Sequence, residues 1–227
     1  MERFGSLMGR RVELKLGGLA AAIEGTVAGW GQDILVLFNG YRYIYVPFRH
    51  VEQLAPGTYE TETKIDAAEP VYSKEGAIHG NQPSCRKILT AARGVFSEIY
   101  FASGRPVHGY VSSVMNDYFI FCTPVHHTVA VSLQHLKYMS PYAPDASAPY
   151  NLSPGKLAPR PSPVTLARTF NVQLRKLEGE LIVLNMGLLP SDTGVLAAAG
   201  EQMLELTGEA GGRSFIAYEQ VQSVHVP

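Results

Sequence analysis

The chain has 227 residues, a formal net charge of −1 and 46% hydrophobic residues. This length accommodates one large domain or two to three small ones, and the near-zero charge gives no general attraction to nucleic acid or to an anionic membrane. We find no apolar run as long as a membrane span and no secretory signal, and the two cysteines, Cys85 and Cys122, are too few for a disulfide framework. The protein is therefore expected to be made in the cytoplasm without a signal peptide.

The first 56 residues predict a short lead-in helix followed by five short strands. Phe4, Leu7 and Met8 share one face at helical spacing. Alternating or doubly apolar segments then predict strands at residues 12–16, 23–30, 34–38, 41–48 and 51–55, with Asn39-Gly40 as a hairpin turn and a corner at Arg49-His50. A sheet this narrow hides its edges and its apolar faces by curling into a small barrel.

The strand that precedes the corner recurs twice. The corresponding positions, each 85 residues from the previous one, are Val46, Val131 and Ile216 on the strand and Val51, Leu136 and Val221 after the corner. Such a repeat predicts the architecture before any single motif does. The predicted organisation is repeat 1 at 1–56, an acidic linker at 57–83, repeat 2 at 84–141, a proline-rich linker at 142–163 and repeat 3 at 164–227.

The second and third copies keep the same order of elements. Ser84 is expected to cap a helix, and strands are predicted at 99–101, 106–114 and 118–122. In the third copy Ser162-Pro163 predicts a helix start, and Phe170 to Leu174 is interpreted as the first strand. The sequence therefore predicts a mostly β protein with short helices, built as three tandem bent-sheet barrels of the SH3-like kind.

The first repeat resembles a known family. Its motifs are Ser6-Leu7-Met8-Gly9-Arg10-Arg11-Val12-Glu13-Leu14, Gly17-Gly18, Glu24-Gly25, Asp33-Ile34, Ile44-Tyr45 and His50-Val51. In order and spacing they resemble the repeats of spore coat protein B and its relatives in endospore-forming bacteria. The resemblance extends over all three repeats, is clearest in the first, and implies a location at the spore surface. The helix and five bent strands are also similar to Sm-like RNA-binding proteins, which implies a ring-forming fold and does not by itself imply RNA.

Two sets of histidines are candidate ligand positions. His50 and His135 recur at the corner, where Gln220 replaces them in the third copy. One histidine per repeat makes neither a metal site nor a catalytic triad, and an amide binds Zn²⁺ poorly, so we expect these side chains to bond to backbone at the corner. Cys122, His126 and His127 are close in sequence, but a closed zinc site needs more ligands of this kind. No metal site is predicted.

No set of residues in the sequence predicts an enzyme. Residues 208–214 are rich in glycine, yet they lack the Gly-Lys-Ser/Thr ending of a phosphate loop and precede a strand, so we interpret them as a hairpin loop. The sequence has no Gly-x-Ser-x-Gly elbow and no convincing pair of catalytic carboxylates. We expect no catalytic residues and no cofactor.

A set of tyrosines is the feature of the sequence that indicates an interface. Tyr41, Tyr43 and Tyr45 share one face of a strand whose other face carries Ile44 and Val46. Such a strand is buried on both faces, either against the neighbouring repeat of the same chain or against a second chain.

The charges of the later two repeats are opposite. Repeat 2 has five basic residues against Glu98 and Asp117, and repeat 3 has four basic residues against seven acidic ones. Opposite signs favour docking of repeats or of chains over a continuous nucleic-acid groove.

The predicted function is that of a non-catalytic structural or scaffold protein, a spore coat component that assembles through sheet edges and aromatic faces. Its expected partners are further copies of itself, in a homo-oligomer, and other coat proteins, with no membrane partner. The alternative prediction is a Sm-like module that binds RNA or a small ligand.

Overall fold

The computed structural model describes residues 2–57, 83–101, 105–143 and 165–227. Most of both predicted linkers, and the helix start predicted at Ser162-Pro163, lie outside these residues. The described strands are all antiparallel and form one continuous open sheet, with only short helices around it. The protein is thus mostly β, as the sequence predicts.

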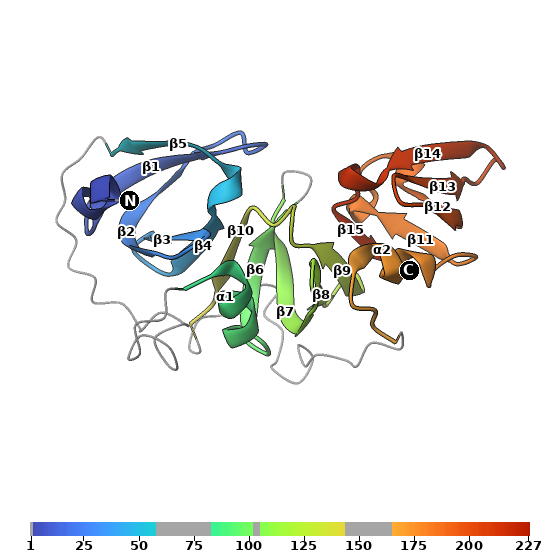
Figure 1. Cartoon of the computed structure of the whole chain (residues 1–227), viewed down its shortest axis with the longest axis horizontal. Helices are drawn as coiled ribbons and strands as arrows, with labels where there is room; N and C mark the ends of the chain where they lie inside the picture. Colours follow the sequence, from blue (N-terminus) through green and yellow to red (C-terminus); the bar gives the residue numbers. More distant parts are fainter. Residues whose placement is uncertain (1, 58–82, 102–104, 144–164) are drawn as a thin grey trace.

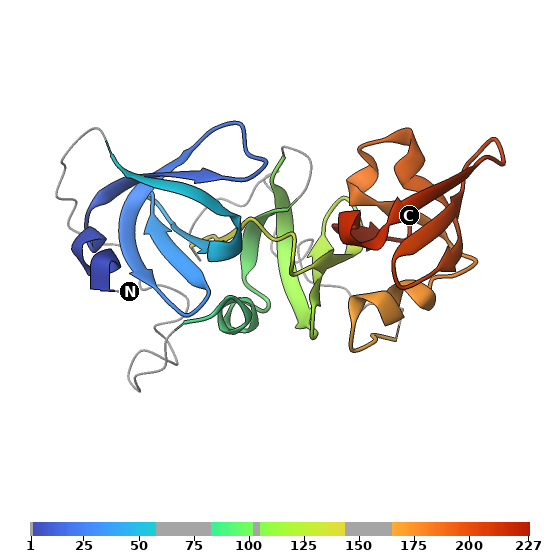
Figure 2. The same ribbon diagram turned by 45° about the horizontal axis from the view of Figure 1, so that its top comes forward.

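The sheet consists of three modules that lie in a row in chain order (Figures 1 and 2). Module 1 contains η1 (Glu2–Leu7), β1 (Arg11–Leu16), β2 (Ile23–Trp30), β3 (Ile34–Phe38), β4 (Tyr43–Pro47), η2 (Phe48–His50) and β5 (Val51–Pro56). Module 2 contains α1 (Cys85–Ala91), β6 (Phe96–Tyr100), β7 (Val107–Val114), β8 (Tyr118–Thr123), β9 (His127–Ser132) and β10 (Tyr138–Pro141). Module 3 contains α2 (Phe170–Arg175), β11 (Leu181–Leu184), η6 (Asn185–Gly187), η7 (Pro190–Asp192), β12 (Thr193–Ala199), β13 (Met203–Thr207), β14 (Arg213–Ala217), η8 (Tyr218–Gln220) and β15 (Ser223–His225).

Strand order is the same in each module. Four strands follow one another as a meander, and the fifth returns to pair with the first, giving β4-β3-β2-β1-β5, β9-β8-β7-β6-β10 and β14-β13-β12-β11-β15. Val46, Val131 and Ile216 occupy equivalent places, opposite Leu35, Phe119 and Leu204 on the preceding strand of each module. The prediction that these three positions correspond is confirmed.

One segment was interpreted wrongly from the sequence. Phe170 to Leu174, taken for a strand, forms the helix α2. Phe170 and Leu174 lie one helical turn apart, and both are buried, so the apolar pattern fits a helix that packs one face on the sheet. The first strand of module 3 is instead β11.

The second strand of every module bends sharply. Its register shifts by one residue at Val27/Gly29, at Val111/Ser113 and at Leu196/Ala198, which is a β-bulge at the same place each time. Just before each bulge a glycine lies against the third strand. A Cβ added at Gly109 would lie 2.1 Å from the carbonyl oxygen of Cys122. Glycine is therefore required where the two backbones approach.

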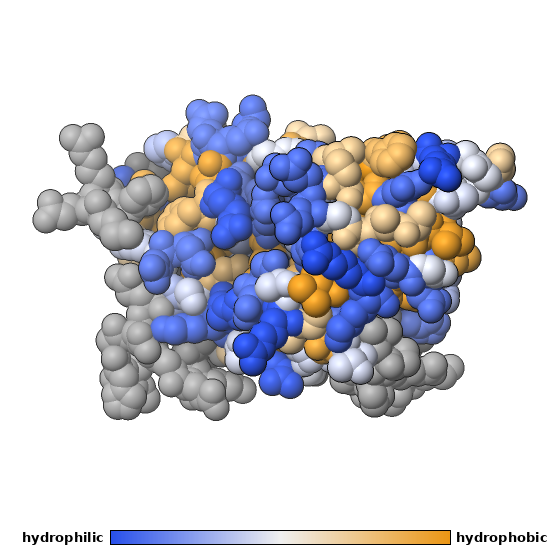
Figure 3. All heavy atoms as spheres, turned by 45° about the vertical axis from the view of Figure 1, so that its right-hand side comes forward, coloured by the Kyte–Doolittle hydropathy of each residue, from blue (hydrophilic) through white to orange (hydrophobic). Residues whose placement is uncertain are grey.

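The third strands form the centre of the core. Every residue of β3 and of β8 is buried, as expected for segments that are apolar on both faces. β13 is less buried, with Met203 at its start 44% exposed. Figure 3 shows hydrophobic residues reaching the surface at the end of the molecule that carries module 3.

Candidate functional site

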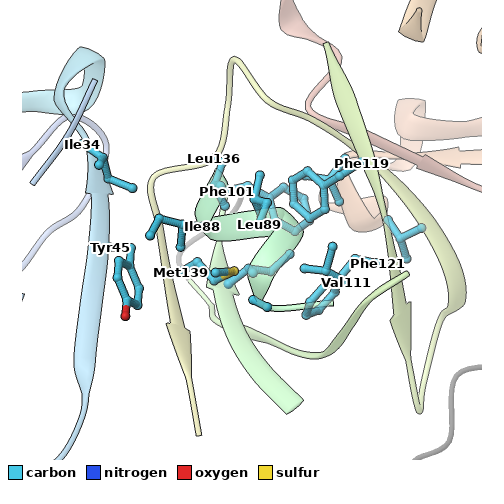
Figure 4. Close-up of a cluster of buried hydrophobic side chains, with 14 of the residues drawn as sticks. Ile34, Tyr45, Ile88, Leu89, Phe101, Val111, Phe119, Phe121, Leu136 and Met139 are labelled. Carbon is cyan, nitrogen blue, oxygen red and sulfur yellow. The ribbon is translucent and has the colours of Figure 1, made fainter. Parts of the chain in front are cut away.

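The first candidate site is junction 1, where the sheet of module 1 continues into module 2. β10 pairs antiparallel with β4, with Met139 opposite Tyr45. Figure 4 shows Tyr45 pointing from module 1 toward Ile88 of α1 and toward Met139, and the Tyr45 side chain is only 1% exposed. Ser140 Oγ donates a 2.8 Å hydrogen bond to the Tyr43 carbonyl across the same seam. Junction 1 is therefore packed like the interior of a domain.

A buried carboxylate lies beneath junction 1. Glu98 of β6 is 7% exposed and accepts a 2.7 Å bond from Arg42 and a 2.8 Å bond from the Tyr138 hydroxyl. Tyr142 also donates to Glu98 at 3.3 Å, and its ring lies 4.8 Å from the Arg42 guanidinium carbon. Burial by itself lowers the pKa of Arg42, but the hydrogen bond and charge of Glu98 raise it overall. A buried charge is tolerated only with such partners, so this cluster fixes how the two modules meet.

Junction 2 joins modules 2 and 3 in the same manner. β15 pairs with β9, with Val224 opposite Ala130 and Ser223 opposite Val131. The hydroxyl of Tyr118, a fully buried residue, donates 2.7 Å to the carbonyl of Ala167, just before α2. The helix of module 3 is thus held by a side chain of module 2.

Both junctions also share a polar contact at the start of a helix. Asp33 Oδ1 of module 1 accepts a 2.8 Å bond from the N–H of Cys85, the first residue of α1. Asp117 Oδ1 of module 2 accepts a 2.8 Å bond from the N–H of Phe170, the first residue of α2. In each case a carboxylate of one module satisfies a backbone donor that the helix itself leaves unbonded.

The predicted corner residues lie along the same junctions. His50 Nδ1 lies 3.3 Å from the Lys137 ammonium, and Nε2 is buried near the Gln134 backbone without a hydrogen-bond partner among the described residues. Burial lowers the pKa of His50 to about 4, and the charge of Lys137 adds to the shift. A neutral imidazole nitrogen can accept a hydrogen bond from an ammonium, so the His50 ring can bind Lys137 across junction 1 instead of repelling it.

His135 repeats this arrangement one module later. The backbone of Glu219 faces the His135 ring, just as Gln134 faces His50, and burial lowers the pKa of His135. Gln220, the third member of the set, lies in module 3, and its carbonyl accepts a bond from Asn185 Nδ2 at 3.3 Å. Each corner histidine thus faces the corner of the following module.

The three tyrosines predicted as an interface have different surroundings. Tyr45 is buried within junction 1, and Tyr43 is partly buried against the same cluster. Tyr41, in the β3–β4 hairpin, is 91% exposed. Junction 1 therefore covers Tyr45 and part of Tyr43 and leaves Tyr41 exposed to solvent.

A small pocket lies beside junction 2, between β8, β9, α2 and the last residues of the chain. It has a volume of about 310 Å³ and a mainly apolar lining. His225, one of its buried polar groups, is 7% exposed, and its Nδ1 has no hydrogen-bond partner among the described residues. Its ring packs 5.2 Å from that of His126, centroid to centroid. Burial and the neighbouring His126 lower the pKa of His225 to about 4.

The remaining candidate groups are placed as follows. Cys122 is buried in β8, and His126 and His127 lie at the turn into β9, where Thr123 Oγ1 accepts the His126 N–H at 2.7 Å. Among the described residues no group of three His, Cys, Asp or Glu side chains is arranged to hold a metal ion. Burial raises the pKa of the Cys85 thiol to about 12. Residues 208–212 form the turn between β13 and β14.

Sequence reasoning missed the polar members of both junctions. Arg42 and Glu98 are 56 positions apart, and nothing in their local pattern pairs them. Asp33 and Asp117 each directly precede the third strand of their repeat, and this shared position is the sequence signal that could have identified them. The positions equivalent to His225 in the other repeats are Ala55 and Ser140, so the repeat pattern gave no signal for a histidine there.

Comparison with known proteins places the chain in a family. Residues 169–224 match the model of the YwrJ third domain, which covers most of the described part of module 3. Over 207 residues the chain is 34% identical to protein YwrJ of Bacillus subtilis (strain 168), a match that covers 89% of this chain and 90% of the relative. Within the described residues no helix is both long and apolar enough to cross a membrane. A match of this identity over nearly the full length of both proteins shows that the chain belongs to the YwrJ family.

Proposed function

We propose that this protein is a non-catalytic structural scaffold, built from three tandem Sm-like barrels, that assembles through its sheet edges. The observation that carries the proposal is that modules already join edge to edge within the chain, at β4–β10 and at β9–β15. The order of strands and the lead-in helix of modules 2 and 3 support the Sm-like description. Within the part of the chain that the structure describes, β14 and β5 are each bonded to one neighbouring strand and end the sheet.

An exposed strand edge is a template for another strand, and proteins that remain monomeric protect such edges. β14 carries one charged residue, Arg213, at its end and presents Phe215, which is 62% exposed. β5 carries Glu52 and ends at Pro56, but it also presents half-buried Leu54 and Ala55. These edges are only weakly protected, which favours assembly. The location that we propose, the spore surface, rests on the resemblance of repeat 1 to spore coat protein B, as does the proposal of other coat proteins as partners.

The alternative, a module that binds RNA or a small ligand, is favoured by one observation. Lys137 and His50 meet at a corner, where Arg49 is exposed beside them. However, Glu52 lies close enough to raise the pKa of Lys137, against the stronger lowering by burial, so the corner carries both signs of charge. A mixed corner is a weaker nucleic-acid site than a continuous basic surface.

The test is the solution mass of the full chain, measured by light scattering over a hundredfold range of concentration. Each chain has a mass of 24.7 kDa, and we expect species of two or more chains that dissociate on dilution. A mass of one chain at every concentration would overturn the scaffold proposal. The ratio of absorbance at 260 nm to that at 280 nm in the same fractions separates the alternative, because co-purified RNA raises it.

A further inference from the structure

The two junctions within the chain have the same register. Tyr45 opposes Met139 in junction 1, and Ala130 opposes Val224 in junction 2. Both partners move by 85 positions from one junction to the next. A third junction in this register places Phe215 of β14 opposite Leu54 of β5.

The strand pairing inside the modules identifies Phe215 and Leu54 independently of the 85-residue spacing. On the fourth strands, Tyr45, Ala130 and Phe215 lie opposite Val36, Ile120 and Glu205 of the strand before. On the fifth strands, Leu54, Met139 and Val224 lie opposite Leu14, Ile99 and Leu184 of the first strand. Phe215 and Leu54 are therefore the structural equivalents of residues that already meet twice in the chain.

Burial at these equivalent positions depends on whether the edge is joined. Tyr45 is 1% exposed and Ala130 is 6% exposed, whereas Phe215 is 62% exposed. The start of the third strand shows the same contrast, since Ile34 and Tyr118 are at most 1% exposed and Met203 is 44% exposed. The end of module 3 thus presents, uncovered, the positions that a following module covers elsewhere.

The corners point to the same occupant. His50 faces the backbone of Gln134, and His135 faces the backbone of Glu219. In module 3 the position of His50 and His135 is taken by Gln220. In module 1 the position of Gln134 and Glu219 is taken by Arg49. The surface that can follow module 3 in this pattern is module 1, which within one chain is at the opposite end of the sheet. The occupant is therefore module 1 of a second copy.

We infer that β14 of one copy pairs antiparallel with β5 of a second copy in the register of the two internal junctions, with Phe215 against Leu54. The contact is heterologous, because it joins two different edges. The inference rests on the proposed scaffold function and names the partner and the residues of its assembly site.

The experiment is disulfide trapping between two separately prepared variants of the full chain, Leu54→Cys and Phe215→Cys. Directly opposed residues of an antiparallel ladder have Cα atoms about 4.5–5.5 Å apart, within the range that a disulfide spans. The equimolar mixture, oxidised with diamide, is expected to give a reducible species of two chains, twice 24.7 kDa. The matched control replaces Phe215→Cys with Val195→Cys, an exposed apolar position on β12, which is not an edge strand. The control mixture should give no such species.

A second measurement uses Phe215→Lys and, as its control, Val195→Lys. The concentration at which half of the chains are assembled should rise at least tenfold for Phe215→Lys and stay unchanged for the control. Assembly without the cross-link, and unaffected by Phe215→Lys, would overturn this inference and leave the scaffold proposal standing. A wild-type chain that stays monomeric would overturn the scaffold proposal itself.

Discussion

Acid should weaken junction 2 through His225. The folded chain holds the pKa of this imidazole at about 4, against an ordinary value of 6.5, chiefly because the ring is buried. Between these two values the unfolded chain binds a proton that the folded chain does not, so the free energy of unfolding falls as the pH falls from 6.5 to 4. One pKa unit corresponds to about 1.36 kcal/mol, so a shift from 6.5 to about 4 sets an upper limit of about 3.4 kcal/mol for this group.

The assay is urea-induced unfolding at pH 7, 5.5 and 4, followed by circular dichroism. The variant His225→Leu cannot take up the proton, and it should lose about 1–3 kcal/mol less stability than wild type between pH 7 and pH 4. Carboxylates titrate in both proteins and cancel in the comparison. The exposed His127 supplies the control, as His127→Asn, because asparagine tolerates the positive φ of 55° at this position. Equal losses in wild type and His225→Leu would refute the argument.

Three further outcomes are expected. Gly109→Ala should lower the free energy of unfolding by about 3 kcal/mol or more, because its Cβ would overlap the Cys122 carbonyl. The control Gly212→Ala has open space around it and should change the free energy of unfolding by no more than about 0.5 kcal/mol. Equal urea midpoints for the two variants would contradict this reasoning. Tyr45→Ala should lower the free energy of unfolding by about 3–5 kcal/mol and speed proteolysis between modules 1 and 2, because the ring is buried in junction 1. An unchanged cleavage rate would show that junction 1 does not depend on this ring. His50→Gln should cost about 1 kcal/mol or less and His50→Ala more, in thermal melts with metal analysis; a metal lost in His50→Gln would instead make the corner a ligand site.

The repeat was predictable because it is written in local patterns. The hairpin turn and the period-2 strands are recognised within short windows. Their recurrence at a spacing of 85 residues placed Val46, Val131 and Ile216 correctly. The same spacing equates Phe170 with Cys85, which starts a helix, and it would have corrected the strand assigned to Phe170–Leu174. Local β-propensity misled there, because an aromatic and a β-branched residue also suit a short helix that packs on a sheet.

The junctions were not predictable to the same degree. An apolar strand looks the same in sequence whether its partner is the next module or another chain, so the tyrosines could not be divided into the buried Tyr45 and the exposed Tyr41. Glu98 gave no signal, since a lone acidic residue inside a strand is usually solvated. Only the fold reveals that Arg42 and two tyrosine hydroxyls converge on it.

The seams have a mechanical consequence. β3 and β4 pair over five positions, whereas β10 meets β4 at one position and β15 meets β9 at two. The β11–β15 ladder inside module 3 is equally short, with two positions, so a pull along the row would load these three short ladders before the longer ones. The separated modules would remain tethered by the continuous chain, at a high effective concentration, and the seams would close again when the force was released. The row of modules would therefore open at a few fixed ladders under load and re-form when the load is removed.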